Sequence, residues 1–575
     1  MPSVRLPQHG DRFASRRGRW VVLLLALSVA ALVLSGCTDP FAGPTISGQG
    51  ASPEKFTGPG PHSNAEDDHS DGVTIASLRP SAAAHNSAYY HQSIAWTTCH
   101  GDLECGTVKV PIDWRKVTAG SITIALVMHR AASASMGDLL VNPGGPGGSG
   151  VEFVENGIDG VVTSPVAKRY NVIGFDPRGV GDSQPVTCFD ASGTDNYLYG
   201  IPPGAIGSPT WIAAEKKISR QLAASCEQHT GPVLAHIDSV SVAEDMDAIR
   251  AALGQSTLNY VGYSYGTYLG TLYAGLFPSR VGRFVLDGAD NPWGDSADSG
   301  GADNSDSGVA GVTPDVDGTV EQAVGFEDSL MTYLKACLAH SRDAIGSQKC
   351  PFDTSLADAK RQVETLFASV DAHPLVATDG RKLGGATLAT AIDDSLYDST
   401  DWPDLTRMFV QLGSGDTTQA FHFADDYNDR NYDGTYYDND DFANLAIGCL
   451  EDGHDVDLRF DAREATELRK VAPMLGISAA YGDLICSGWK YGPSPFPNPI
   501  HAEGSGPILI LGTTGDPATP YQDAQSLAKQ LDNGHLVTLH GQGHTAYDLG
   551  NDCIDTTVDA YLLLGTVPSR DPQCH

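Results

Sequence analysis

The sequence has few positive charges. Its 575 residues contain 36 lysines and arginines against 71 aspartates and glutamates, which gives a formal net charge of −35. A nucleic-acid partner needs a basic protein surface, so this balance argues strongly against nucleic acid. A solvated acidic surface accounts for most of the excess, and a field that attracts cationic substrates is the functional alternative.

Motifs for metals and nucleotides are also missing. None of the 11 cysteines has zinc-finger spacing, so we expect no structural metal. The acidic stretch 295–318 contains Asp-x-Asp pieces without the order of an EF-hand loop, and it predicts a solvated loop. The glycine-rich segment 142–150 lacks the Gly-Lys-Ser/Thr ending of a phosphate-binding loop. We therefore expect no cofactor.

The N-terminus has the pattern of a targeting segment. Arginines between residues 12 and 19 precede an apolar run from Trp20 to Leu34, which is shorter than the ~20 residues that a membrane span needs. Leu34-Ser35-Gly36-Cys37 resembles a bacterial lipobox, which implies a signal peptide at 1–36 and lipidation of Cys37. An uncleaved anchor and an ordinary signal peptide are the alternatives. Each of the three places the rest of the chain outside the cytoplasm, and the first attaches it to the membrane.

The remaining cysteines fit an exported protein. Without Cys37 their number is even, as expected for a disulfide-bonded chain. Spacing does not fix connectivity, but sequential pairing is the simplest expectation. It would give Cys99–Cys105, Cys188–Cys226, Cys337–Cys350, Cys449–Cys486 and Cys553–Cys574.

Beyond the signal, the chain is too long for one compact core. Residues 37–90 are rich in Gly, Pro, Ser, Asp and Ala and predict a flexible tether. Short apolar runs then alternate with helical patterns, which predicts an α/β fold with a doubly wound, mostly parallel sheet. We expect the first part of this core at 91–292 and the second at 500–575. The mainly helical residues between them, 293–499, predict a lid insertion.

One Gly-x-Ser-x-Gly motif occurs, Gly262-Tyr263-Ser264-Tyr265-Gly266. An apolar run at 258–261 precedes it, and a helix-compatible run follows until Pro278. Strand, sharp turn and helix form the nucleophile elbow of an α/β-hydrolase, which exposes a serine hydroxyl above the sheet. A chance Gly/Ser loop is the alternative, and the flanking segments favour the elbow.

A nucleophilic serine needs a base and an acid that orients the base. Asp516 follows an apolar strand pattern at 507–512, and His544 follows another at 536–539. The order Ser264, Asp516, His544 is that of α/β-hydrolases. Asp516 could instead be a turn or capping residue, and His544 an exposed loop residue with His540 as its competitor.

Acyl transfer also needs an oxyanion hole made of two backbone N–H groups. We expect one from Tyr265, directly after the nucleophile. The other is expected from Gly144 or Gly145, in the glycine-rich loop after the strand pattern at 139–142.

These motifs resemble a known family. The segments 142–148, 174–183, 261–267 and 285–288 are similar to prolyl-aminopeptidase-type serine peptidases, and more closely to exported actinobacterial tripeptidyl aminopeptidases. The resemblance covers roughly residue 94 to the C-terminus. It implies an α/β-hydrolase that releases short peptides, with tripeptides as the expected length, or single residues from free N-termini through an acyl-enzyme. Arg178 in the second segment is expected to brace the oxyanion loop.

The resemblance also implies carboxylates that bind the substrate ammonium. The family has an acidic residue two places after a lid cysteine, a position held by Glu451 after Cys449, with Asp452 adjacent. A surface acid beside a disulfide is the alternative for Glu451.

For the whole chain, the alternatives are a carboxylesterase or lipase acting on envelope lipids and a catalytically silent binding lipoprotein. Peptides with a free N-terminus are the expected partners.

Overall fold

The computed structural model describes residues 73–81, 84, 87–293, 318–352, 355–451, 456–495 and 497–575. The predicted signal peptide, Cys37, the tether as far as residue 72 and most of the acidic stretch 295–318 lie outside these residues. No described helix is long and apolar enough to cross a membrane.

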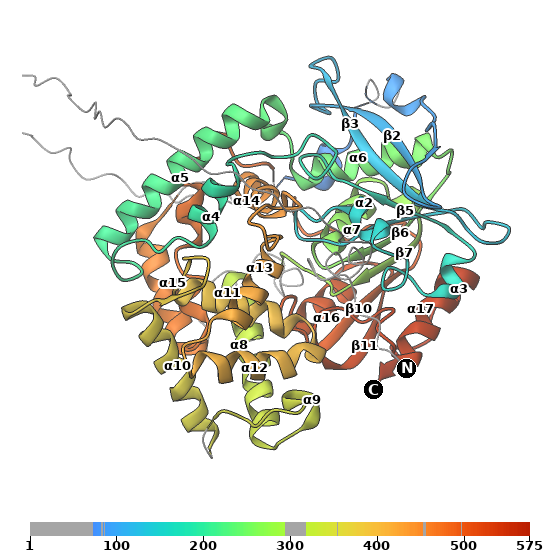
Figure 1. Ribbon diagram of the computed structural model, residues 1–575. Coiled ribbons are helices and arrows are strands. Elements are labelled where there is room, and N and C mark those ends of the chain that lie inside the picture. The colour runs from blue at the N-terminus through green and yellow to red at the C-terminus, as the bar shows by residue number, and fades with distance from the viewer. Residues whose placement is uncertain are drawn as a thin grey trace, which may run out of the picture. The chain divides into compact units, whose positions relative to one another are not determined.

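One sheet of ten strands organises the described residues (Figure 1), in the order β1-β2-β3-β5-β4-β6-β7-β10-β11-β12. Pairing is antiparallel from β1 to β5 and parallel from β5 to β12. The doubly wound, mostly parallel sheet predicted from the sequence is confirmed. Its strands are β1 (Thr97–Thr98), β2 (Glu104–Pro111), β3 (Ser121–His129), β4 (Asp138–Asn142), β5 (Asn171–Phe175), β6 (Leu258–Tyr263), β7 (Val281–Asp287), β10 (Ile508–Gly515), β11 (Gly534–Gln542) and β12 (Gln573–Cys574).

Alternate residues of the central strands bury opposite faces of the sheet. Tyr260 and Phe284 belong to one hydrophobic cluster, and their neighbours Val261 and Val285 belong to another. This period of two is the geometry of a strand covered on both sides. The first cluster includes residues of α6 (Ser239–Ala252), α7 (Tyr265–Leu276) and α16 (Tyr521–Gln530), and the second includes residues of α2 (Gly150–Glu155), α3 (Ser164–Ala167) and α17 (Asp552–Leu564).

Parallel register brings the predicted loops to one edge of the sheet. Asn142 pairs with Gly262, and Tyr263 pairs with Asp287, which in turn pairs with Leu511. The carboxyl ends of β4, β6, β7 and β10 therefore lie next to one another, where α/β folds build their sites.

The helical insertion has a core of its own, because its helices share a large cluster of buried apolar side chains. Helices from before β6 also join this part, since Tyr199, directly after α4, belongs to the cluster and α5 packs on the 3-10 helix η8. In Figure 1, α4 lies beside α14, where the ring of Tyr197 stacks on Phe442, and α5 lies beside α15, whose Ala465 and Leu468 share a cluster with Trp211. The elements are α4 (Ala191–Leu198), α5 (Pro209–Thr230), α8 (Gly318–Leu338), α9 (Arg342–Ile345), α10 (Leu356–Ala372), α11 (Gly385–Tyr397), α12 (Trp402–Leu412), α13 (Thr418–Tyr427), α14 (Asp440–Glu451), α15 (Leu458–Val471), the hairpin β8 (Leu375–Val376) and β9 (Lys382–Leu383), and the 3-10 helices η6 (Ser399–Asp401), η7 (Gly476–Ser478) and η8 (Gly482–Gly488).

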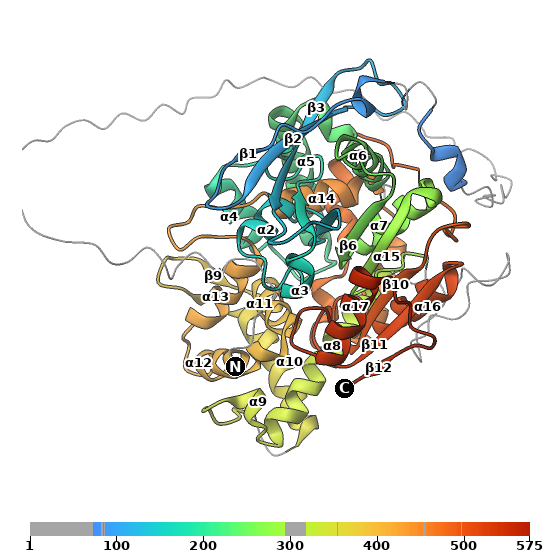
Figure 2. The same ribbon diagram turned by 90° about the vertical axis from the view of Figure 1, so that its right-hand side faces the viewer.

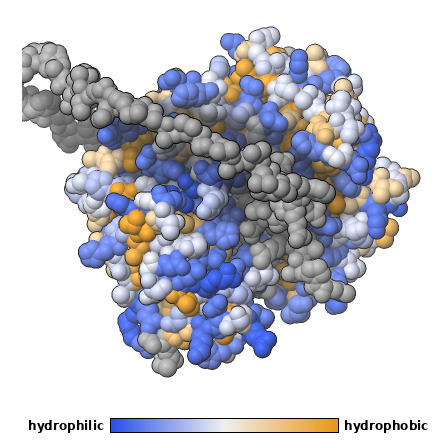
Figure 3. Space-filling model, viewed as in Figure 1, coloured by the Kyte–Doolittle hydropathy of each residue, from blue (hydrophilic) through white to orange (hydrophobic). Residues whose placement is uncertain are grey.

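The insertion and the sheet nevertheless form one compact unit, Val73–His575. Figure 2 shows the lid helices packed along one side of the sheet and its covering helices. On the face seen in Figure 3, hydrophilic residues predominate and apolar ones are scattered, as the acidic composition leads one to expect.

The described end of the expected tether packs against this unit. Val73 forms a β-bridge with Pro497, and Leu78 is buried. Tyr89 and Tyr90, in the 3-10 helix η2 (Ala88–Tyr90), lie edge-on to the ring of Trp114. A few apolar side chains within a Gly/Pro/Ser-rich composition thus bind this stretch to the sheet domain.

The five expected disulfides are confirmed, with the sequential connectivity. Cys449–Cys486 links the end of α14 to η8, and Cys188–Cys226 links α5 to the segment before α4.

Candidate active site

Ser264 occupies the predicted sharp turn between β6 and α7. Its φ of 53° and ψ of −130° are unusual for a residue with a side chain, and its N–H donates to the carbonyl of Asp287 at 2.9 Å. The flanking glycines are required by space, because a Cβ on Gly262 would lie 2.3 Å from the carbonyl oxygen of Gly266. The geometry is that of a nucleophile elbow.

Asp516 and His544 meet in the structure. Nδ1 of His544 lies 2.9 Å from each carboxylate oxygen of Asp516. Asp516 also accepts the N–H groups of Ala518 and Thr519, so it has the turn role considered for it as well as the contact with histidine. The competitor, His540, instead pairs with Gln573 at the edge strand β12.

The environment of His544 suits a base. Burial alone would lower the pKa of its imidazole, but the charge and hydrogen bond of Asp516 raise the pKa above its ordinary value, with further contributions from Asp287 and Asp290. Its side chain is only 9% exposed. Nε2 is buried and has no hydrogen-bond partner among the described residues, and His544 lines the same cavity as Ser264. This nitrogen is available to take a proton.

The glycine-rich loop lies directly against the serine. A Cβ on Gly144 would lie 2.9 Å from Cβ of Ser264 and 2.5 Å from the carbonyl oxygen of Tyr263. The N–H of Gly144 donates to Oδ1 of Asn142 at 3.1 Å. The N–H groups of Gly145 and Tyr265 make no hydrogen bond within the described part of the chain. Of the two candidate glycines, Gly145 therefore has the available donor.

Asp176, which the sequence did not single out, braces this loop. Its carboxylate accepts the hydroxyl of Ser149 at 2.5 Å and the N–H groups of Val151 and Asp182. Arg178, expected in this role, is fully buried elsewhere and forms a two-bond ion pair with Asp245 of α6. The expectation for Arg178 was wrong, since the acid two residues earlier holds the loop.

Ser264 and His544 line a cavity of about 410 Å³ between the sheet edge and the helical insertion. Tyr397, Tyr427 and Tyr437 contribute aromatic surface. The cavity is otherwise notable for its acids, which sequence reasoning missed, and no lysine or arginine lies among its described lining residues. The acids are Glu152, Asp394, Asp438, Asp440 and Asp441.

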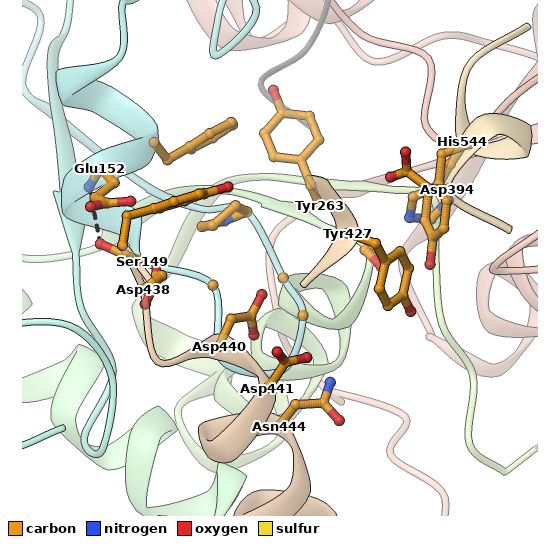
Figure 4. A pocket seen from close by; sticks show the side chains of 18 of the residues that line it. Ser149, Glu152, Tyr263, Asp394, Tyr427, Asp438, Asp440, Asp441, Asn444 and His544 are labelled. Carbon is orange, nitrogen blue, oxygen red and sulfur yellow. Dashed lines mark hydrogen bonds between the residues drawn. The ribbon is translucent and has the colours of Figure 1, made fainter. Parts of the chain in front are cut away.

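Two segments present most of these acids (Figure 4). Asp440 and Asp441 begin α14, with Asp438 two residues before it, and Glu152 lies on α2 beside the glycine-rich loop. Burial, and then the charge of Asp438 and further acids, raises the pKa of Glu152 to about 8. The run Asp438 to Asp441 before a helical pattern is the signal that could have identified this group.

Glu451 does not line the cavity. Its carboxylate accepts the N–H of Ser239, at the start of α6, at 2.6 Å. It lies near Tyr265 and Tyr268, whose phenol pKa values are raised by burial and then by the charge of Glu451. Asp452 lies outside the described residues. The structure thus gives Glu451 a partly buried contact with the first turn of α6.

The helical insertion is bonded to the loops that carry these residues. The N–H of His544 donates to the carbonyl of Tyr397 at 2.8 Å, and Gln322 of α8 donates to the carbonyl of Ala518 at 2.9 Å. Asn439 accepts the N–H of Gly181 and donates to the carbonyl of Gly179. These bonds hold the His544 loop, the Asp516 turn and the loop after β5 against the insertion.

A possible metal cluster is disqualified by its chemistry. Cys99, His100, Cys105 and Glu155 place potential ligand atoms within 4.8 Å of one another. The two cysteines form a disulfide with each other, so their sulfurs are not thiolate ligands.

Comparisons with known proteins agree with this geometry. Residues 139–336 match the family model described as "alpha/beta hydrolase fold", and residues 472–574 match that described as "TAP-like protein". "Serine protease Hip1" of Mycobacterium tuberculosis is 33% identical over 510 residues, covering 84% of this chain and 91% of the relative. "Tripeptidyl aminopeptidase" of Streptomyces lividans is 29% identical, covering 89% and 90%. "Carboxylesterase B" of Mycobacterium tuberculosis is 32% identical, covering 82% and 86%.

With the fold, these relatives define a serine hydrolase of the α/β-hydrolase class. The similarity to Hip1 extends over most of both chains, and the TAP-like family model matches the C-terminal residues 472–574. The chain belongs to the tripeptidyl-aminopeptidase-like serine peptidases, as its motifs predicted.

Proposed function

We propose that the protein is an extracytoplasmic serine exopeptidase that releases short peptides, with tripeptides the expected length, or single residues from free N-termini. The observation that carries this proposal is the cavity itself. Ser264 and His544 share it with five carboxylates, and no described lining residue is a lysine or arginine. A neutral ester gains little from such a wall, whereas an ammonium group is attracted to it.

The roles follow from position. Oγ of Ser264 attacks the scissile carbonyl while Nε2 of His544 removes its proton, and Asp516 holds the Nδ1–H edge of the imidazole. The N–H groups of Gly145 and Tyr265 stabilise the oxyanion. His544 then protonates the leaving amine. In the second half of the reaction it activates the water that releases the acyl group.

The acids of the cavity would bind the substrate ammonium in place of Glu451. Asp440 lies against the oxyanion loop, because a Cβ on Gly145 would lie 3.3 Å from Oδ1 of Asp440. Burial and the neighbouring acids raise the pKa of Glu152, and a bound cation would favour its charged form. An ammonium held here would fix the distance between the N-terminus and the serine, which limits cleavage to the end of a chain.

Localisation follows from the N-terminal pattern and the disulfides. Five disulfides fit an oxidising compartment. With the lipobox-like segment ending at Cys37, they support export and attachment to the membrane through a lipidated Cys37.

A carboxylesterase acting on envelope lipids is the second candidate, and the relative named "Carboxylesterase B" favours it. Its machinery would be the same. The two candidates differ in whether turnover needs a free substrate amine.

The test is a rate comparison on purified protein lacking residues 1–37. It uses a tripeptide amide reporter with a free N-terminus, its N-acetylated twin and a short-chain ester, each with Ser264→Ala as control. Cleavage confined to the free-amine peptide supports the exopeptidase. Cleavage of the ester with both peptides untouched would replace it with the esterase, and activity that survives Ser264→Ala would refute both.

A further inference from the structure

Asp287 lies between the serine and the histidine. It is the last residue of β7 and is fully buried. Its carbonyl accepts the N–H of Ser264 at 2.9 Å. Its Oδ2 accepts the N–H groups of Ala546 at 3.1 Å and Tyr547 at 2.8 Å, in the loop that carries His544. One residue thus contacts both the nucleophile turn and the histidine loop.

The other carboxylate oxygen of Asp287 is unusual. Oδ1 is buried and has no hydrogen-bond partner among the described residues. A buried carboxylate oxygen without a donor is unfavourable unless its charge acts on something nearby. The neighbouring residue, Gly288, is close to the imidazole, because a Cβ placed there would lie 3.0 Å from Cε1 of His544.

Among the described residues, His544, Asp516 and the phenol of Tyr263 interact electrostatically with Asp287. Burial raises the pKa of Asp287 to about 6, the two backbone N–H groups and His544 act to lower it, and Asp516 acts to raise it. In return, Asp287 raises the pKa of His544, as do Asp516 and Asp290.

We propose that Asp287 is a positioning residue that sets Ser264 and the His544 loop in register and supplies a second buried negative charge to the imidazole. Asp516 orients His544 through a hydrogen bond at Nδ1, whereas Asp287 acts through the backbone and through its charge. This inference rests on the proposed roles of Ser264 and His544.

Two substitutions separate the effects of Asp287. Asp287→Asn removes the charge but keeps an oxygen that can accept the two N–H groups, whereas Asp287→Ala removes both. Asp548→Asn is the matched control. Asp548 lies in the same loop, accepts the N–H of Gly160 at 2.7 Å, and has a pKa raised by burial to about 6. It is not among the main groups that shift the pKa of His544, which are Asp516, Asp287 and Asp290.

The measurement is the rate at which a fluorophosphonate labels Ser264 covalently, recorded as a function of pH on the full-length protein. The melting temperature of each variant is measured alongside. Labelling requires neutral His544, so its rate falls as pH drops through the pKa of that residue. Because Asp287 raises this pKa, Asp287→Asn should move the acidic limb to lower pH by about one unit. Its melting temperature should change little, and Asp548→Asn should leave the limb in place. Asp287→Ala should reduce labelling at every pH.

An Asp287→Asn profile that superimposes on the wild type would overturn the proposal, even if Asp287→Ala fails to fold. An equal shift in Asp548→Asn would also overturn it, because the effect would then be general to the loop. If the probe labels the wild type but the acidic limb of Asp287→Asn is not shifted, this inference fails while the proposed function stands. A wild type that resists the probe, or labelling that survives Ser264→Ala, defeats the proposed function together with it.

Discussion

The backbone N–H of His544 donates to the carbonyl of Tyr397, the last residue of the lid helix α11, at 2.8 Å. The ring of Tyr397 also meets the imidazole edge-on, with centroids 5.5 Å apart. The histidine is therefore oriented by the insertion as well as by Asp516.

Replacing Tyr397 tests this relationship. Tyr397→Ala removes the ring against the imidazole, and small displacements of a catalytic group cost about ten- to hundredfold in rate. We expect fluorophosphonate labelling of Ser264 to slow by about this factor in Tyr397→Ala. Tyr397→Phe, which keeps the ring, should retain most of the rate. Tyr432→Ala, at a fully exposed tyrosine, should have no effect; equal losses in all three variants would refute a specific role.

Gly144→Ala should abolish activity. The added Cβ would lie 2.9 Å from Cβ of Ser264, and the residue has a φ of +103°. We expect hydrolysis to fall by at least about a hundredfold, as for loss of one oxyanion donor. Gly254→Ala is the control, because its φ of +73° is also positive but nothing lies within 4 Å of the new carbon. It should cost about 1–2 kcal/mol in the free energy of unfolding with activity unchanged. Comparable activity in the two variants would contradict the geometry.

The cavity acids should control the Michaelis constant for free-amine peptides. Asp440→Asn and Asp441→Asn each remove one negative charge from the wall near the oxyanion loop. We expect KM to rise about tenfold for a free-amine peptide and to change little for an ester. Glu451→Gln, outside the cavity, should leave KM unaltered. If Glu451→Gln raised KM and the two aspartate variants did not, Glu451 would be the ammonium-binding residue that the motif predicts.

Glu152 should make stability depend on pH. Its pKa in the folded protein is raised to about 8, so ionisation is disfavoured there compared with the unfolded chain. Above its ordinary pKa of about 4.3, the unfolded state loses the proton more readily, and the residue destabilises the fold increasingly until about pH 8. Glu152→Gln should therefore raise the melting temperature at pH 8 and change it little at pH 4. If Glu152→Gln changed the melting temperature by the same amount at pH 4 and at pH 8, Glu152 would ionise as readily in the folded protein as in the unfolded chain.

The fold of the sheet domain could be predicted because each strand leaves a local pattern. The runs at 139–142, 258–262 and 507–512 became β4, β6 and β10, with small changes at their ends. In the insertion, for which the sequence predicted mainly helical structure without fixing each helix, α12 and α13 are two helices that separate at Gly413. No local pattern had indicated helix α11 individually, although it lines the cavity through Asp394 and Tyr397.

The site could be predicted where a motif carries it and not where distant segments meet. Ser264, Asp516 and His544 each follow a recognisable strand. Glu152 and Asp440 come from segments far apart in sequence, and only the tertiary packing of α14 onto the oxyanion loop brings them to one cavity. Glu451 satisfied a spacing rule, but its helix turns it towards α6.

The four hydrogen bonds described between the insertion and the loops of the sheet edge affect how a substrate reaches the cavity. Swinging the helices aside would break the contacts at Tyr397, Gln322 and Asn439, and with them the arrangement of His544, the Asp516 turn and the loop next to the oxyanion hole. A roof fixed in this way favours entry of a loose chain end over that of a folded protein surface. Under the proposed exopeptidase function, selection for N-termini would begin with access to the cavity, before the cavity acids bind the substrate ammonium.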